Sequence, residues 1–128
     1  MASDSSDSRP AVALGHVSLE VSDLPASAEF FTGLGMREIV LRDSFAVLEL
    51  RGGSHLILNQ AEGPVSPGTK VPFDLMVDDI EATRDAFEER GLSPSGFEKG
   101  QVHTEFTISG PDGCNVTMTS SHTSGRVV

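Results

Sequence analysis

Tryptophan and tyrosine are absent from this chain of 128 residues, and cysteine occurs once, as Cys114. A single cysteine cannot form an intrachain disulfide, so we expect a protein of a reducing compartment rather than a disulfide-stabilised secreted one. Without Trp or Tyr, stacking on an aromatic ligand would depend on phenylalanine, and most of the Phe residues fall at predicted core positions.

Basic residues are also scarce, because nine Lys and Arg stand against 19 Asp and Glu and give a formal net charge of -10. This charge repels phosphate backbones and anionic lipids, so we expect neither a nucleic-acid nor a membrane partner. No apolar run is long enough to span a bilayer. The opening MASDSSDSRP has neither the basic region nor the apolar run of a secretory signal, and we expect a cytoplasmic protein.

One sequence pattern occurs twice in the chain. The segment GHVSLEVSDLPASAEFF, from Gly15, is echoed by VPFDLMVDDIEATRDAF, from Val71, and each copy ends in a glycine-containing turn and an apolar strand. The length fits one domain, or two half-domains too small to fold apart. We predict a disordered arm at 1–12, a single domain at 13–121 and a tail at 122–128, the domain comprising module one (14–60), a linker (61–70) and module two (71–121).

Each module is predicted as a strand, a helix and three further strands. In the first strand, apolar and polar residues alternate, which is typical of a strand with one buried face. Asp23 is placed to cap the first helix, and Gly33 or Gly35 to end it. At the start of the second helix, Asp78 with Glu81 resembles a capping box.

Four stretches together resemble the vicinal oxygen chelate superfamily, which includes glyoxalase I, bleomycin-resistance proteins and extradiol dioxygenases. They are GHVSLEVSDLPASAEFF with the following GLGM, GGSHLILNQ, FDLMVDDIEATRDAFEERGL and FTISGPDGCNVTM. The resemblance implies an α+β fold of two tandem βαβββ modules, which form a curved mixed sheet around a cup with the helices outside. It also implies a homodimer.

The resemblance further implies where a metal would bind. Metal-dependent members carry one ligand on the first strand and one on the last strand of each module, and the matching positions here are His16, Ile57, Pro72 and Thr117. Ile and Pro side chains have no donor atom, and a Thr hydroxyl is a poor ligand for Zn²⁺, Ni²⁺ or Fe²⁺. We therefore expect the family's usual metal centre to be missing and no cofactor to be required.

Strand alternation gives an independent set of site residues. If the apolar strand faces pack on the helices, the opposite faces line the cup. The predicted ligand-binding residues are His16, Glu20, His55, Ile57, Asn59, Asp74, Met76, His103, Glu105 and Thr117. Three histidines and three carboxylates of this set are expected to converge.

Three interpretations of this set remain open. In the first, the cup binds an organic ligand without metal, and Glu20, Asp74 and Glu105 attract its cationic group. In the second, a divalent transition metal is held at a rearranged site and serves a lyase, isomerase or dioxygenase; the candidate ligands are His16, His55, His103, Glu20 and Glu105. In the third, His103 acts as a general base oriented by Glu105.

The sequence favours the first interpretation, a small-molecule-binding protein of the glyoxalase or bleomycin-resistance type. It does not identify the ligand, decide between a binding protein and an enzyme, or say whether the modules pair within one chain or swap between chains.

Overall fold

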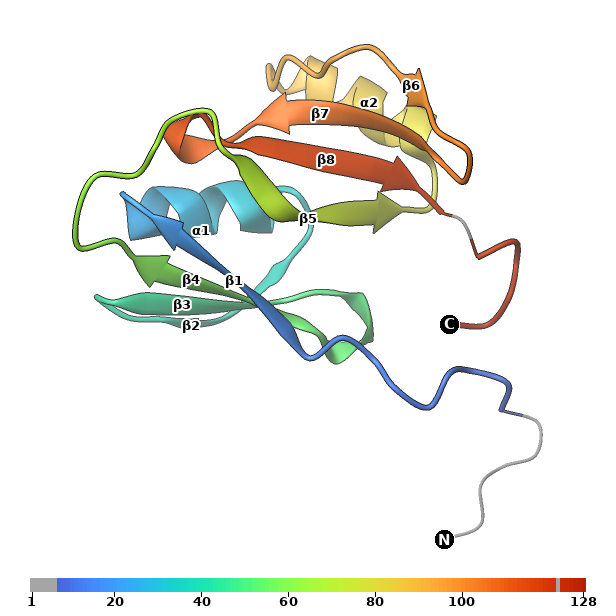
Figure 1. Cartoon of the computed structure of the whole chain (residues 1–128), viewed down its shortest axis with the longest axis horizontal. Helices are drawn as coiled ribbons and strands as arrows, with labels where there is room; N and C mark the ends of the chain where they lie inside the picture. The colour runs from blue at the N-terminus through green and yellow to red at the C-terminus, as the bar shows by residue number, and fades with distance from the viewer. Residues whose placement is uncertain (1–6, 122) are drawn as a thin grey trace, which may run out of the picture.

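The computed structural model describes residues 7–121 and 123–128, which form two modules with the same order of elements (Figure 1). Module one contains β1 (His16–Val21), α1 (Leu24–Gly33), β2 (Arg37–Leu41), β3 (Phe45–Glu49) and β4 (His55–Gln60). Module two contains β5 (Lys70–Val77), α2 (Ile80–Glu89), β6 (Glu98–Lys99), β7 (Thr104–Ser109) and β8 (Asn115–Ser120). The predicted α+β fold of two βαβββ modules is confirmed.

Each module forms its own four-stranded mixed sheet, in the order β1-β4-β3-β2 and β5-β8-β7-β6. The first and last strands of a module pair in parallel, and the remaining neighbours pair antiparallel. Among the described residues no ladder joins β1 to β5, although the two strands approach each other. The curved sheet is therefore divided into two halves at its centre.

The two helices begin with aspartate caps. The Asp23 carboxylate accepts a hydrogen bond from the Ala26 backbone N–H at 3.1 Å, and the Asp79 carboxylate accepts one from Ala82 at 3.0 Å. Side-chain acceptors at this position satisfy backbone donors that the first helical turn leaves without partners. The cap at Asp23 is confirmed, whereas the capping box predicted at Asp78 is wrong because Asp79 is the N-cap residue.

The core is formed by the alternate strand positions that the sequence pattern predicts. Leu48, Leu56 and Leu58 have 0% of their surface exposed, and burying each such side chain contributes roughly 1.5–3 kcal/mol. On β1, Ser18 and Glu20 are exposed on the opposite face. The alternation therefore separates a buried strand face from an exposed one, as the sequence pattern predicts.

Strand β8 departs from this pattern. Thr117 and Thr119 belong to the predicted cup face, yet only 4% and 0% of their surfaces are exposed. Strand β8 lies between β5 and β7, and Thr117 is paired with Asp74 on one side and Thr107 on the other. A short side chain on a strand that is flanked on both sides leaves little surface for solvent to reach.

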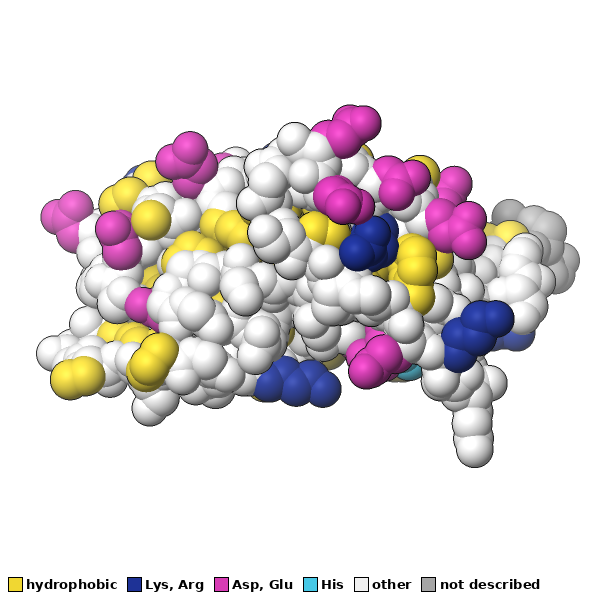
Figure 2. Space-filling model, turned by 90° about the horizontal axis from the view of Figure 1, so that it is seen from above, with side chains coloured by type: hydrophobic (Ala, Val, Ile, Leu, Met, Phe, Trp, Pro, Cys, Tyr) yellow, Lys and Arg dark blue, Asp and Glu magenta, His cyan; other side chains and the backbone are white. Residues whose placement is uncertain are grey.

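The surface is predominantly acidic. On the face shown in Figure 2, Asp and Glu side chains outnumber Lys and Arg side chains, and the hydrophobic side chains lie in separate patches between polar atoms. In the described part of the chain both helices are ten residues long, and neither meets the length and hydropathy that crossing a bilayer requires.

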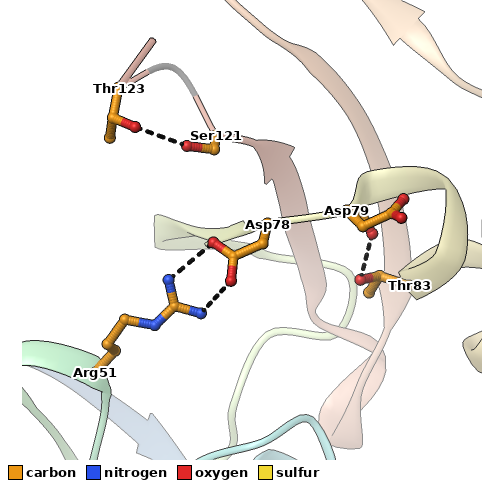
Figure 3. Close-up of polar contacts among 6 residues, drawn as sticks. All are labelled: Arg51, Asp78, Asp79, Thr83, Ser121 and Thr123. Carbon is orange, nitrogen blue, oxygen red and sulfur yellow. Dashed lines mark hydrogen bonds and ion pairs between the residues drawn. The ribbon is translucent and has the colours of Figure 1, made fainter. Parts of the chain in front are cut away.

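The two modules contact each other through equivalent loops. After β1, the Ser22 backbone N–H and hydroxyl both donate to the carboxylate of Asp112, in the turn before β8. After β5, the Asp78 carboxylate accepts two hydrogen bonds from Arg51, in the turn before β4, at 3.0 and 3.1 Å (Figure 3). These hydrogen bonds lower the pKa of Asp78. The loop after the first strand of each module thus binds the last turn of the other, and the modules pair within one chain.

The predicted arm and tail contain no helix or strand where the structure describes them, at residues 7–12 and 123–128. Residues 1–6 of the arm and residue 122 of the tail lie outside the described residues.

Candidate functional site

A cavity of about 590 Å³ lies between the two modules, beside β1 and β5. Its walls come from β1, α1, β4, the linker, the start of β5 and the turn that precedes β8. This volume lies within the range that is typical of small-molecule sites. We call this space the intermodule cavity.

The missing ladder between β1 and β5 explains why the cavity forms here. Each of these strands is paired on one side only, β1 with β4 and β5 with β8. Pro72 on β5 has no backbone N–H and cannot donate to a neighbouring strand. The cavity follows the unpaired edges and reaches both faces of β1, because it is lined by Ser18 and Glu20 from one face and by Leu19 from the other.

The walls of the intermodule cavity differ in polarity with depth. The buried wall is apolar and includes Val21, Phe31 and Val71, whose exposed fractions are 1–3%. The exposed rim carries polar and charged side chains, among them Glu20 and Lys70. An apolar wall with a few polar groups at its margin is the usual composition of a small-molecule site.

Three charged side chains line the cavity: Glu20, Lys70 and Asp112. The Asp112 carboxylate already accepts two hydrogen bonds from Ser22. Glu20 and Lys70 make no ion pair with any described residue. The rim therefore offers one available carboxylate and one available ammonium group.

Two of the ten predicted site residues, Glu20 and Asn59, line the intermodule cavity. They face each other across the parallel pairing of β1 with β4. The other eight lie outside its lining, namely His16, His55, Ile57, Asp74, Met76, His103, Glu105 and Thr117. The cavity thus includes only the end of β1 and β4 that carries Glu20 and Asn59.

The predicted histidines and carboxylates do not form one metal-sized group among the described residues. In module one, His16 lies opposite His55, whose Nε2 is 4.0 Å from a Glu49 carboxylate oxygen. In module two, the His103 Nε2 lies 3.3 Å from the Glu105 Oε1. Within residues 7–121 and 123–128, no three His, Cys, Asp or Glu side chains are arranged to hold a metal ion.

The four positions that match the family's metal ligands do not fit a metal either. Ile57 and Pro72 offer no donor atom, and the Thr117 hydroxyl is buried without a hydrogen-bond partner in the described structure. A transition metal needs several nitrogen, sulfur or carboxylate donors around it. His16 alone supplies one, so these residues do not form the family's centre.

The pair formed by His103 and Glu105 has the spacing of a base and its orienting carboxylate. His103 precedes β7 and is not part of it, because the strand begins at Thr104. A smaller cavity of about 300 Å³ is lined by Glu105 but not by His103. Of the two members of the pair, only Glu105 therefore lines this smaller cavity.

Several cavity residues were missed from the sequence, most importantly Ser27 and Cys114. Ser27 is 0% exposed and its hydroxyl has no hydrogen-bond partner among the described residues. Cys114 is buried, and this burial raises the pKa of its thiol. One sequence signal was available for Ser27, since it lies one helical turn before Phe31, and residues four apart share a helix face.

Comparison with known proteins gives one family. Residues 13–118 match the sequence model of the Glyoxalase/Bleomycin resistance protein/Dioxygenase superfamily. No curated protein sequence matches significantly.

Several solved structures have a similar fold. An integron cassette protein from the mobile metagenome of the Halifax Harbour sewage outfall has a TM-score of 0.73 and 21% identity, covering 85% of this chain and 98% of that one. Lactoylglutathione lyase from Agrobacterium tumefaciens has a TM-score of 0.73 and 18% identity, with coverages of 92% and 100%. Oxidase ChaP-H2 has a TM-score of 0.70 and 18% identity, with coverages of 88% and 95%. At these identities the similarity shows the fold alone.

Proposed function

Because this chain belongs to the glyoxalase/bleomycin resistance protein/dioxygenase superfamily, we propose that it binds a small organic molecule in its intermodule cavity. The observation that carries the proposal is the cavity itself, which has a volume of about 590 Å³, an apolar buried wall and a charged rim. Spaces of this size and composition bury most of the surface of a small ligand.

The available carboxylate of Glu20 favours a ligand with a cationic group. Asp112, the other carboxylate of the lining, is already hydrogen-bonded to Ser22. The net charge of -10 also raises the concentration of cations near the surface. Lys70, on the opposite strand edge, can donate to an oxygen atom of the same ligand.

The proposed binding does not use a metal. The positions that hold the metal in metal-dependent relatives carry His16, Ile57, Pro72 and Thr117, and only His16 among them supplies a good metal donor. The alternative of a metal-dependent lyase, isomerase or dioxygenase needs three or more donors to gather elsewhere, and the described residues contain no such group. We further propose that the protein works as a homodimer in the cytoplasm, on the basis of the family likeness and the single cysteine.

Replacing Glu20 with Gln tests the proposal. With a panel of small amines measured by isothermal titration calorimetry, the Glu20→Gln variant is expected to bind the tightest amine about tenfold more weakly. A charge-assisted hydrogen bond to a carboxylate is worth roughly this much. The matched control is Glu62→Gln, because Glu62 is an exposed carboxylate of the linker that does not line the cavity.

The control variant should bind every amine as the parent does. If Glu20→Gln also keeps the parent affinity for each amine that binds, the proposed cationic site is wrong.

A further inference from the structure

Ser27 lines the intermodule cavity, and its hydroxyl is buried without a hydrogen-bond partner among the described residues. Ser27 lies in α1 and is 0% exposed. Burying a hydroxyl without a partner is unfavourable, and such groups are few in native proteins. A hydroxyl of this kind in a cavity wall is a candidate contact for a ligand.

The second helix shows that the lack of a partner does not follow from helix geometry. Thr83 occupies the position in α2 that Ser27 occupies in α1, and both backbone N–H groups donate to the capping aspartate's carbonyl at 3.0 Å. The Thr83 hydroxyl also donates to the Asp79 carbonyl, at 2.8 Å (Figure 3). The Ser27 hydroxyl makes no such bond to Asp23.

The surroundings of Ser27 on the cavity wall are apolar. Phe31, one helical turn further along α1, is 1% exposed and packs against Phe73 of β5 with ring centroids 6.5 Å apart. Val71 and Cys114 continue the wall on the side of module two. A polar partner for Ser27 can therefore be supplied by water or by a molecule that enters the cavity.

We propose that the ligand is an amphiphilic amine with polar groups at both ends. Its ammonium group binds Glu20 at the exposed rim, its apolar body packs on the buried wall, and a hydroxyl or similar group at its far end hydrogen-bonds to Ser27. This assignment rests on the proposed function and adds the chemical class of the ligand.

Matched pairs of amines test the assignment. The probes are benzylamine, phenethylamine and 3-phenylpropylamine, each compared with its para-hydroxyl derivative, so that three chain lengths are sampled. In at least one pair the hydroxylated amine should bind the parent protein about three- to tenfold more tightly, which is the effect of one hydrogen bond. The Ser27→Ala variant should lose this preference and bind the unhydroxylated amine as the parent does.

Thermal unfolding of the free protein gives a second readout. Ser27→Ala replaces a buried hydroxyl that has no partner, so its unfolding midpoint should rise. The matched control, Thr83→Ala, removes a hydroxyl that is bonded, so its midpoint should fall while the preference for the hydroxylated amine persists. A residue with only a structural role would not raise stability and lower selectivity in the same variant.

The outcomes separate the two proposals. If Glu20→Gln weakens all amines but no pair shows a preference, or if Ser27→Ala keeps the preference, the assignment of Ser27 is wrong and the proposed function stands. If no amine binds, or if Glu20→Gln changes nothing, the proposed function fails and the assignment fails with it.

Discussion

At the scale of single residues, the intermodule cavity combines groups that are available to a ligand with groups that are not. Glu20 and Lys70 carry charges at the rim without ion-pair partners in the described structure, whereas Asp112 is held by Ser22. A ligand gains most from groups that have not already been satisfied within the protein. Specificity should therefore depend on Glu20 and Lys70 more than on the number of polar residues around the cavity.

Cys114 allows the burial of the cavity wall to be measured. Desolvation raises the pKa of its thiol above the ordinary value for cysteine, and only the thiolate reacts readily with alkylating reagents. The folded state therefore holds this proton to a higher pH than the unfolded state. The difference in pKa contributes to the free energy of unfolding. This contribution is complete below the pKa of the unfolded thiol and is lost as the pH rises through the pKa of the folded thiol.

We predict that iodoacetamide alkylates Cys114 more slowly in the native protein than in protein unfolded by guanidinium. The midpoint of the pH profile should also be higher in the native protein. Mass spectrometry of timed samples gives both quantities, and a saturating amine should slow the native reaction further. A native midpoint at or below that of the unfolded protein would contradict the burial of this thiol.

At the scale of helices and strands, the repeat provides two instances of the same helix cap. Asp23 and Asp79 cap α1 and α2 with the same geometry, at 3.1 and 3.0 Å. A capping aspartate contributes about 1 kcal/mol to the free energy of unfolding. The two caps lie in separate helices and share no partner, so their contributions should add.

We predict that Asp23→Ala and Asp79→Ala each lower the free energy of unfolding by about 1 kcal/mol, and that the double variant loses about twice as much. Urea denaturation followed by far-ultraviolet circular dichroism measures the change. Asp43→Ala is the control, because Asp43 is exposed and caps no helix. Single variants as stable as this control would show that the caps contribute nothing.

The individual helices and strands also show how much of the structure the sequence predicts. Alternation identified β1 and β4 because each presents one apolar face to the core. Asp23 was recognised as a cap because its side chain bonds to a backbone group of its own helix. Strand β2 is mostly exposed and contains an irregular register near Glu38, so it lacks that alternation. The burial of Thr117 depends on neighbouring strands that its own segment does not encode.

Only part of the candidate site could be predicted, also for a physical reason. Glu20 and Asn59 follow from the alternation of their own strands. The remaining walls depend on how the two modules pack and on the path of the linker, which contributes Val65, Ser66 and Thr69. These arrangements arise from contacts between distant segments, and the residue pattern of one segment does not contain them.

At the scale of the whole molecule, two equivalent contacts join the modules, and one of them involves Asp112, which lines the cavity in which we propose that the ligand binds. Ser22 with Asp112 and Arg51 with Asp78 connect the loops of one module to the turns of the other. Strands β1 and β5 lie side by side between these contacts without a ladder. The two modules together therefore provide a cavity that neither could enclose alone.

The metal content of the protein tests most directly the claim that this molecule binds its ligand without the family's metal. Untagged protein purified without chelator should contain far less than one transition metal ion per chain by elemental analysis, because Ile57, Pro72 and Thr117 replace three donors. It should also remain substoichiometric after incubation with Ni²⁺, Zn²⁺ or Fe²⁺ and desalting. One tightly held transition metal ion per chain would contradict the account.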